Sequence, residues 1–306
     1  MTFDRWPQPE TLRAAPDYTI GQLQAAMAEG QILTGQAVRC DAALNLHIRL
    51  GALSGIMPRG ECVAPFLSGA QREIAVLSRV GKPTCFVVTD IDEESEQPTV
   101  WLSRTAVQLR AQEALLSSLS PGDIIPAAVT HLEPFGAFVD IGCGLPSLIG
   151  IENLSVSRIY HPSDRLTVGQ SIRAAVRSVD VENRRITLTH RELLGTWAQN
   201  AALFSVGETV RGVVRSIEPY GVFIELTPNL SGLAEPRADL RPGMAVSVYI
   251  KSILPQRMKV KLTVIDVLAP YDAPTPPRYF ITEGHIDEWV YTPACCDKKI
   301  VKTIFG

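Results

Sequence analysis

The chain contains an internal repeat, and no other feature of the sequence limits its fold as strongly. The segment Phe135-Gly136-Ala137-Phe138 returns as Tyr220-Gly221-Val222-Phe223. In each copy the glycine of this segment follows an earlier glycine, Gly122 or Gly207, by 14 positions, and those two earlier glycines are 85 positions apart. The chain is therefore predicted to hold tandem copies of one small unit.

Each copy consists of short runs rich in β-branched residues, separated by Gly and Pro turns. About five such runs fit into one unit, which is typical of a small antiparallel barrel of the OB type. The closing runs are Arg185–Thr189 and Lys259–Thr263. The predicted fold class is therefore mainly β, with tandem five-stranded barrels joined by short α-helices.

A third, weaker copy precedes these two. Residues 29–35 match the opening run, and Val100–Arg104 match the closing run. Leu44, Asn45 and His47 hold the positions that are aromatic or glycine in the other copies. Because Asn tolerates the left-handed conformation, we expect the turn to survive, although one ring is lost.

The repeats and the stretches between them divide the chain into segments. The predicted segments are a loose N-terminal tail at 1–18, a degenerate repeat with a leading helix at 19–104, a helical connector at 105–120, a repeat at 121–191, a second helical connector at 192–205, a repeat at 206–268, and a Pro-rich joint with a C-terminal extension at 269–306. Thr19 and Gln22 have the spacing of a capping box for the leading helix. Neither connector is rich in Gly or Ser, so both are expected to be semi-rigid.

Composition limits the classes of function. Apolar residues make up 46% of the 306 residues and charged ones 20%, which excludes disorder throughout. The formal net charge is −3, so binding to nucleic acid would need positive charge gathered locally. The sequence shows neither an apolar run long enough to cross a membrane nor a secretory leader, so we expect a cytoplasmic protein without a membrane partner. The six cysteines lack CxxC spacing, and neither a zinc ribbon nor a disulfide framework is indicated.

On these residues the second and third units resemble the S1 RNA-binding domain. The stretch from Trp197 to Val206-Gly207 resembles the connector between repeats in the family of bacterial small-subunit (30S) ribosomal protein S1. The three copies would cover roughly residues 29–266 as a short, three-repeat form. The resemblance implies S1-type OB barrels that bind single-stranded RNA, including mRNA, and that act in translation at the small ribosomal subunit, in RNA decay or in transcription.

Four aromatic residues are the candidates for binding bases. Single-stranded RNA is commonly held by rings that stack on its bases and by cations beside its phosphates. The candidate rings are Phe135, Phe138, Tyr220 and Phe223. Residues three apart in a regular strand point to opposite faces, so we expect the glycine inside each segment to allow a bulge or a positive φ that turns both rings outward. The alternative is that Phe138 and Phe223 belong to the barrel cores.

Five cations are the candidates for binding phosphates. They are Arg177, Arg185, Arg215, Lys259 and Lys261. The two lysines alternate with Val260 and Leu262, so both should project from one face of a strand. The resemblance also implies a histidine in the middle strand, which falls on Pro58, Gly150 and Glu235, and an Asp/Arg pair, which falls on Asp180 and Arg185 in the second unit. The second unit is thus expected to keep most of the site, the third part of it, and the first almost none.

The first unit is expected to have another role. It lacks the aromatic pair and carries the acidic run Asp92-Glu93-Glu94. We expect it to contact protein, in particular the small ribosomal subunit, although a solvated hairpin tip would explain the acids equally well. Two other hypotheses remain for the function of the whole chain: a protein–protein scaffold that has lost RNA binding, and an RNA-binding adaptor in RNA decay or transcription.

Signatures of catalysis are absent from the sequence. It has no GxxxxGK[ST], HExxH or GxSxG motif, and His285, Cys295 and Cys296 fit no standard zinc spacing. No enzyme activity, no cofactor and no metal are therefore expected.

Overall fold

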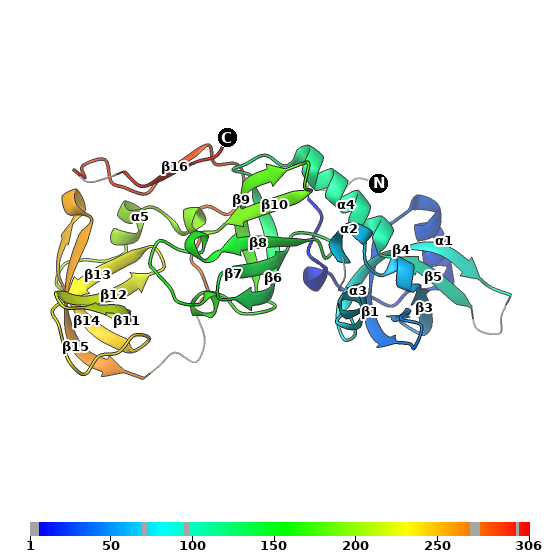
Figure 1. Ribbon diagram of the computed structural model, residues 1–306, viewed down its shortest axis with the longest axis horizontal. Coiled ribbons are helices and arrows are strands. Elements are labelled where there is room, and N and C mark those ends of the chain that lie inside the picture. The colour runs from blue at the N-terminus through cyan, green and yellow to red at the C-terminus, as the bar shows by residue number, and fades with distance from the viewer. Residues whose placement is uncertain (1–5, 69–71, 95–97, 270–275, 298–299) are drawn as a thin grey trace.

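Three closed barrels stand in a row along the molecule (Figure 1). The computed structural model describes residues 6–68, 72–94, 98–269, 276–297 and 300–306. Each barrel has five strands, and the third strand of each pairs in parallel with the fifth to close it. The prediction of a mainly β fold of tandem OB-type barrels is confirmed.

The first barrel is preceded by a helix and interrupted by an insertion. Its strands are β1 (Leu33–Cys40), β2 (Leu46–Leu50), β3 (Leu53–Met57), β4 (Pro83–Asp92) and β5 (Thr99–Ser103). The preceding helices are η1 (Glu10–Leu12) and α1 (Ile20–Glu29), and those between β3 and β4 are η2 (Arg59–Glu61), α2 (Pro65–Ser68) and α3 (Arg72–Leu77). The capping box expected at Thr19 and Gln22 is present.

The second and third barrels repeat the same strand plan. The second contains β6 (Ile124–Glu133), β7 (Gly136–Asp140), β8 (Pro146–Gly150), η4 (Ile151–Asn153), η5 (Pro162–Asp164), β9 (Ser171–Asp180) and β10 (Arg185–Thr189). The third contains β11 (Thr209–Glu218), β12 (Gly221–Thr227), β13 (Leu230–Ala234), β14 (Ala245–Leu254), η7 (Pro255–Arg257) and β15 (Lys259–Leu268).

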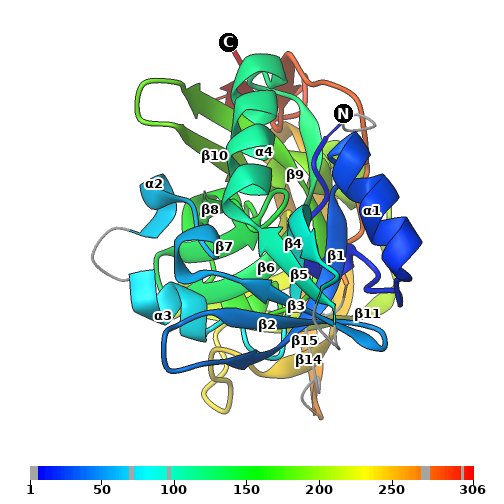
Figure 2. The same ribbon diagram turned by 90° about the vertical axis from the view of Figure 1, so that its right-hand side faces the viewer.

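Helices connect the barrels and take part in their cores. The first connector is α4 (Thr105–Ser118); the second consists of η6 (Arg191–Leu194) and α5 (Trp197–Ala201). Val107, Ala111 and Leu115 of α4 are fully buried in one apolar cluster with residues of both β4 and the second barrel. Figure 2 views the row from the end of the first barrel and shows α4 beside the stacked barrels. Because one core spans the first junction, these two barrels hold each other in place.

Residues 6–10 are packed between the first two barrels, so the expectation of a loose tail does not hold for them, whereas residues 11–17 are mostly exposed. Glu10 is only 1% exposed. The Tyr18 N–H donates to Leu50 O at 3.0 Å, and the Cys143 N–H donates to Gln8 O at 3.0 Å. No periodicity in the sequence predicts this packing, because the segment is held by individual polar contacts to distant residues. Residues 1–5 lie outside the described part of the chain.

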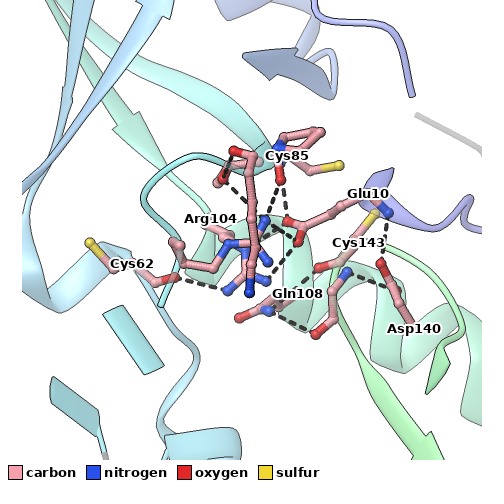
Figure 3. A network of polar contacts seen from close by, with 12 residues as sticks. Glu10, Cys62, Cys85, Arg104, Gln108, Asp140 and Cys143 are labelled. Atoms are coloured by element: carbon pink, nitrogen blue, oxygen red, sulfur yellow. Dashed lines mark hydrogen bonds and ion pairs between the residues drawn. The ribbon is translucent and has the colours of Figure 1, made fainter. Parts of the chain in front are cut away.

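A buried charged network ties the first two barrels to this segment (Figure 3). The Glu10 carboxylate binds Arg104 at 2.7 Å and Arg79 at 2.9 Å, and the Glu10 N–H donates to Asp140 of β7 at 2.7 Å. Burial by itself would raise the pKa of Glu10, but the charges of Arg104 and Arg79 outweigh it and lower this pKa to about 2. Glu10 is therefore held as a carboxylate between two arginines.

The C-terminal segment returns along the second and third barrels. Strand β16 (Glu288–Val290) pairs with β17 (Lys302–Ile304). Trp289 and Phe305 are 4% and 7% exposed and belong to the apolar cluster that contains the core of the third barrel. The phenol of Tyr279 lies 3.0 Å from Nε2 of the buried His190. These contacts anchor the extension to the connector between the two barrels.

Candidate nucleic-acid interface

A tight turn exposes the first ring of the second barrel. Glu133 of β6 pairs directly with Gly136 of β7, so only Pro134 and Phe135 form the turn. Phe135 is 56% exposed there, outside the alternation of either strand. Phe138 follows on β7 between the buried residues Ala137 and Val139, and its half-buried ring therefore faces outward. The Phe135 and Phe138 rings meet edge to face, with centroids 5.9 Å apart.

The third barrel repeats this ring pair. Glu218 pairs with Gly221, which leaves Tyr220 in the turn with 67% of its surface exposed. Its ring meets that of Phe223 edge to face at a centroid separation of 6.2 Å. All four predicted rings thus lie on outer surfaces, and the alternative that Phe138 and Phe223 are core residues is wrong.

The two glycines meet the expectation only in part. Gly136 pairs with both neighbouring strands and Gly221 pairs with β11, and neither forms the expected bulge. Gly221 has a positive φ of 157°, which is the other conformation that was expected. A Cβ atom on Gly136 would lie 2.4 Å from Ile149 O, and one on Gly221 would lie 2.7 Å from Ala234 O. Glycine is therefore required because the neighbouring strand comes too close for a side chain.

Strand pairing places corresponding outward residues in a row across each barrel. In chain order of the barrels, the rows are His47, Ile56, Trp101 and Asp90; Phe138, Leu148, Thr187 and Ser178; and Phe223, Leu233, Lys261 and Ser252. The three barrels therefore present the same face with different side chains.

The third barrel adds lysines to its ring pair. Lys259 and Lys261 are both exposed and line a groove of about 630 Å³ together with Tyr220 and Phe223. Lys251, in the bulge of β14, reaches the same groove and pairs with Glu235 at 3.2 Å. This face combines an aromatic platform with cations, as single-stranded nucleic acid requires.

The second barrel carries arginines and a third ring. Arg185 is exposed opposite Asp180, whose pKa is lowered chiefly by hydrogen bonds from Asn183 at 2.8 and 2.9 Å. Arg177 is exposed in the bulge of β9. His131, which the sequence analysis did not select, lies opposite Phe138 with ring centroids 6.4 Å apart. Its position in the sequence, two residues before the end of β6, could have indicated that His131 lies beside the ring pair.

Arg215 is not available for phosphates, which corrects its selection. It sits in the bulge of β11, and its side chain is only 12% exposed. Its guanidinium binds Glu225 at 2.8 Å and Asp164 of the second barrel at 3.4 Å. Arg165 binds the same Glu225, so these four groups form a closed ionic cluster at the junction of the barrels. The partners come from separate parts of the chain, and no local pattern indicated them.

The first barrel presents a different face. His47 is held by Asp41 and Arg39, each at 3.2 Å, and Leu44 rather than Asn45 takes the left-handed conformation, with φ of 64°. Trp101, which was not selected from the sequence, occupies the position of Thr187 and Lys261 and is 36% exposed opposite Asp90. A tryptophan beside a carboxylate is less suited to a polyanion than the rings of the other barrels are.

The fold and these faces define a tandem OB-barrel protein. Residues 118–191, which include the second barrel, match the family model of the S1 RNA binding domain. The chain is 32% identical over 193 residues to small ribosomal subunit protein bS1 of Staphylococcus aureus (strain COL), a match over 58% of this chain and 49% of that protein. It is 32% identical over 199 residues to the bS1 homolog of Bacillus subtilis (strain 168), with 60% and 51% covered.

The chain thus spans about half the length of these relatives. Among solved structures, a multidomain protein with nucleic acid binding domains from Streptococcus pneumoniae matches over 76% of this chain and 73% of its own, at 12% identity and a TM-score of 0.25. Within the described residues, no helix is both long and apolar enough to cross a bilayer.

Proposed function

We propose that this chain binds single-stranded RNA, including mRNA, through the outer faces of its second and third barrels during translation at the small ribosomal subunit. The observation that carries the proposal is the same exposed edge-to-face ring pair at the same turn of two barrels. The match to the S1 RNA binding domain and the similarity to bS1 proteins support RNA binding and a role like that of a ribosomal protein.

Each face supplies the two kinds of contact that a single strand needs. Bases stack on the ring pairs, and stacking contributes about 1–3 kcal/mol per base. Phosphates pair with Arg177 and Arg185 on the second barrel and with Lys259 and Lys261 on the third. These cations are exposed, so they approach a polyanion without first losing a buried partner. The net charge of −3 is compatible with this because the positive charge lies beside the rings.

The first barrel is proposed to contact protein on the small subunit. Its face lacks a free ring pair, because His47 is held by Asp41 and Arg39. The half-exposed Trp101 beside Asp90 offers the amphipathic surface that protein interfaces favour.

Titration of labelled single-stranded RNA into the full chain tests the proposal. We expect binding that weakens as salt rises, because bound phosphates release counterions. Replacing Phe135, Phe138, Tyr220 and Phe223 by alanine should lower the affinity about a hundredfold or more. Tyr160→Ala, which removes a ring that is 62% exposed outside the rows, is the matched control and should bind as the unchanged protein does.

Full affinity in a folded four-ring variant would refute the assigned faces. No binding by the unchanged protein would favour the scaffold alternative. Sedimentation with small ribosomal subunits then tests the role in translation, since an adaptor in decay or transcription would stay out of those fractions.

A further inference from the structure

A groove separates the C-terminal strand β17 from β9 of the second barrel. It has a volume of about 400 Å³. Its lining residues are Arg177, Ser178, Arg191, Lys302, Thr303, Ile304 and Phe305. The groove therefore joins a barrel that carries a ring pair to a segment that is not part of any barrel.

One wall of the groove continues the outer face of the second barrel. Ser178 ends the row that starts at Phe138, and its hydroxyl lies 2.6 Å from that of Thr187 in the same row. Arg177 occupies the bulge of β9, as Lys251 occupies the bulge of β14 in the third barrel. Lys251 lines the ring groove of its barrel, so Arg177 holds the matching position at the border between ring face and β17.

A second connection reaches the ring pair from the other side. The Ile151 N–H donates to Phe135 O at 2.9 Å. Next along the chain, Glu152 O accepts a hydrogen bond of 3.3 Å from Arg191, which also donates to the Thr303 hydroxyl of β17 at 3.2 Å. Short contacts thus link the turn that carries Phe135 to the C-terminal strand.

Strand β17 is fixed firmly enough to serve as a wall. The Thr303 hydroxyl donates to the buried carboxylate of Glu192 at 2.7 Å, and Phe305 is 7% exposed. Lys302 and Ile304 alternate with Thr303, so they point away from this anchor, and Ile304 is 62% exposed.

The cations of the groove differ in availability. Arg191 is bound to Glu192 at 3.0 Å, while Arg177 is exposed. Lys302 pairs with Glu288 at 2.7 Å, but both side chains are nearly half exposed, at 45% and 44%. An exposed ion pair of this kind contributes little free energy, so a phosphate can compete with Glu288 for Lys302.

We propose that β17 extends the RNA-binding surface of the second barrel. A strand whose bases stack on Phe135 and Phe138 continues into the groove, where Arg177 and Lys302 bind its phosphates and Ile304 packs against a base or ribose. This inference rests on the proposed function of the same barrel, and it gives the C-terminal extension a direct part in holding the RNA.

Oligomers of two lengths test the inference in the full chain. A single-stranded RNA of about four nucleotides, near the minimum for one OB fold, covers the ring face alone, whereas one of about twelve also enters the groove. Lys302→Ala should bind the longer oligomer about fivefold more weakly and the shorter one within about twofold of the unchanged protein. The slope of log affinity against log salt for the longer oligomer should fall by about 0.7, which is the contribution of one phosphate contact on a single strand.

The matched control removes one cation from the first barrel. Arg59 forms an exposed pair with Glu73 at 2.8 Å, as Lys302 does with Glu288, so Arg59→Ala deletes the same charge in comparable surroundings. This variant should bind both oligomers as the unchanged protein does. Glu288→Gln should strengthen binding of the longer oligomer only, because it releases Lys302.

The outcomes separate this inference from the proposed function. An equal loss for both oligomers in Lys302→Ala would show that Lys302 acts at the ring face, and unchanged binding of the longer oligomer would show that the groove is not used. Either result overturns the extension while the ring faces stand. If the unchanged protein binds neither oligomer, the proposed function itself fails.

Discussion

Glu10 binds Arg104 through both carboxylate oxygens, at 2.7 and 2.9 Å, although the two residues are 94 positions apart. Both side chains are almost completely buried, and the Glu10 N–H continues the contact to Asp140 of the second barrel. The N-terminal segment, which belongs to neither barrel, thus links the first barrel to the second. The orientation of the ring face on the second barrel relative to the first barrel depends on this joint.

Loss of the Glu10 charge should weaken the joint. Glu10→Gln leaves the guanidinium of Arg104 buried without its anion, and breaking such a pair costs about 3–5 kcal/mol. Because the pKa of Glu10 is about 2, against an ordinary value of 4.5, its stabilisation is complete above pH 4.5 and is lost as the pH falls towards 2. Urea unfolding from pH 7 to pH 3 should therefore show a difference in unfolding free energy between the two proteins that becomes smaller as the pH falls. A difference that stays constant, or no difference, would contradict this role of Glu10.

His190 should make the free energy of unfolding depend on pH in a second range, between 6.5 and about 4. Its side chain is 1% exposed, and burial lowers its pKa from 6.5 to about 4. A histidine held neutral in the fold stabilises it above pH 6.5, and this contribution, about 3 kcal/mol, is lost as the pH falls from 6.5 towards 4. His190→Gln cannot titrate, so its unfolding free energy relative to the unchanged protein should rise as the pH is lowered from 7 to 5. A difference that does not vary with pH would rule out the assignment.

Gly136→Ala should disturb the second ring pair through the backbone. The new Cβ would lie 2.4 Å from Ile149 O, so β7 and β8 must separate, and we expect a loss of about 1–3 kcal/mol in stability. RNA affinity of the second barrel should fall with it, because Phe135 and Phe138 flank the displaced residue. Gly21→Ala, at a helical site with open space around it, is the control; it should leave binding unchanged and raise stability by up to about 1 kcal/mol. Thermal melts and RNA titrations check both variants, and a stable Gly136→Ala protein would show that the strands can yield.

Removing the lysines of the ring face and removing the buried Arg215 should have opposite effects on stability and on the salt dependence of RNA binding. Replacing Lys259 and Lys261 by alanine should reduce the salt dependence of RNA binding by about 0.7 per contact, with little change in stability. Arg215→Ala removes ion pairs to Glu225 and Asp164, so it should lower stability by about 1–3 kcal/mol and leave the salt dependence as it was. A reduced salt slope in a folded Arg215→Ala protein would restore Arg215 to the binding face.

The barrels and the rings could be predicted because their signals are local. Gly136 and Gly221 stand at the same place in two copies, and each marks the end of a turn that exposes a ring. The lysines on β15 followed from strand alternation alone. The sequence did not predict why glycine is needed at these positions. Glycine is needed because the next strand comes too close for a side chain, and not because the strand forms a bulge.

The remaining features could not be predicted because their partners are distant in the sequence. Arg215 is neutralised partly by Asp164 from the preceding barrel, and Glu10 is held by Arg104. Strand β17 has only three residues, too few for a period of two to be recognised, and it is held by β16 and by Arg191 and Glu192 of η6. Trp101 became part of a face only once the pairing of β3 with β5 was known.

Ultraviolet crosslinking of the full chain to single-stranded RNA, with the modified residues located by mass spectrometry, tests the central claim most directly. We expect crosslinks at Phe135 and Phe138 and, separately, at Tyr220 and Phe223. Crosslinks confined to other surfaces, for example around Trp101 or Tyr160, with all four rings unmodified, would contradict it.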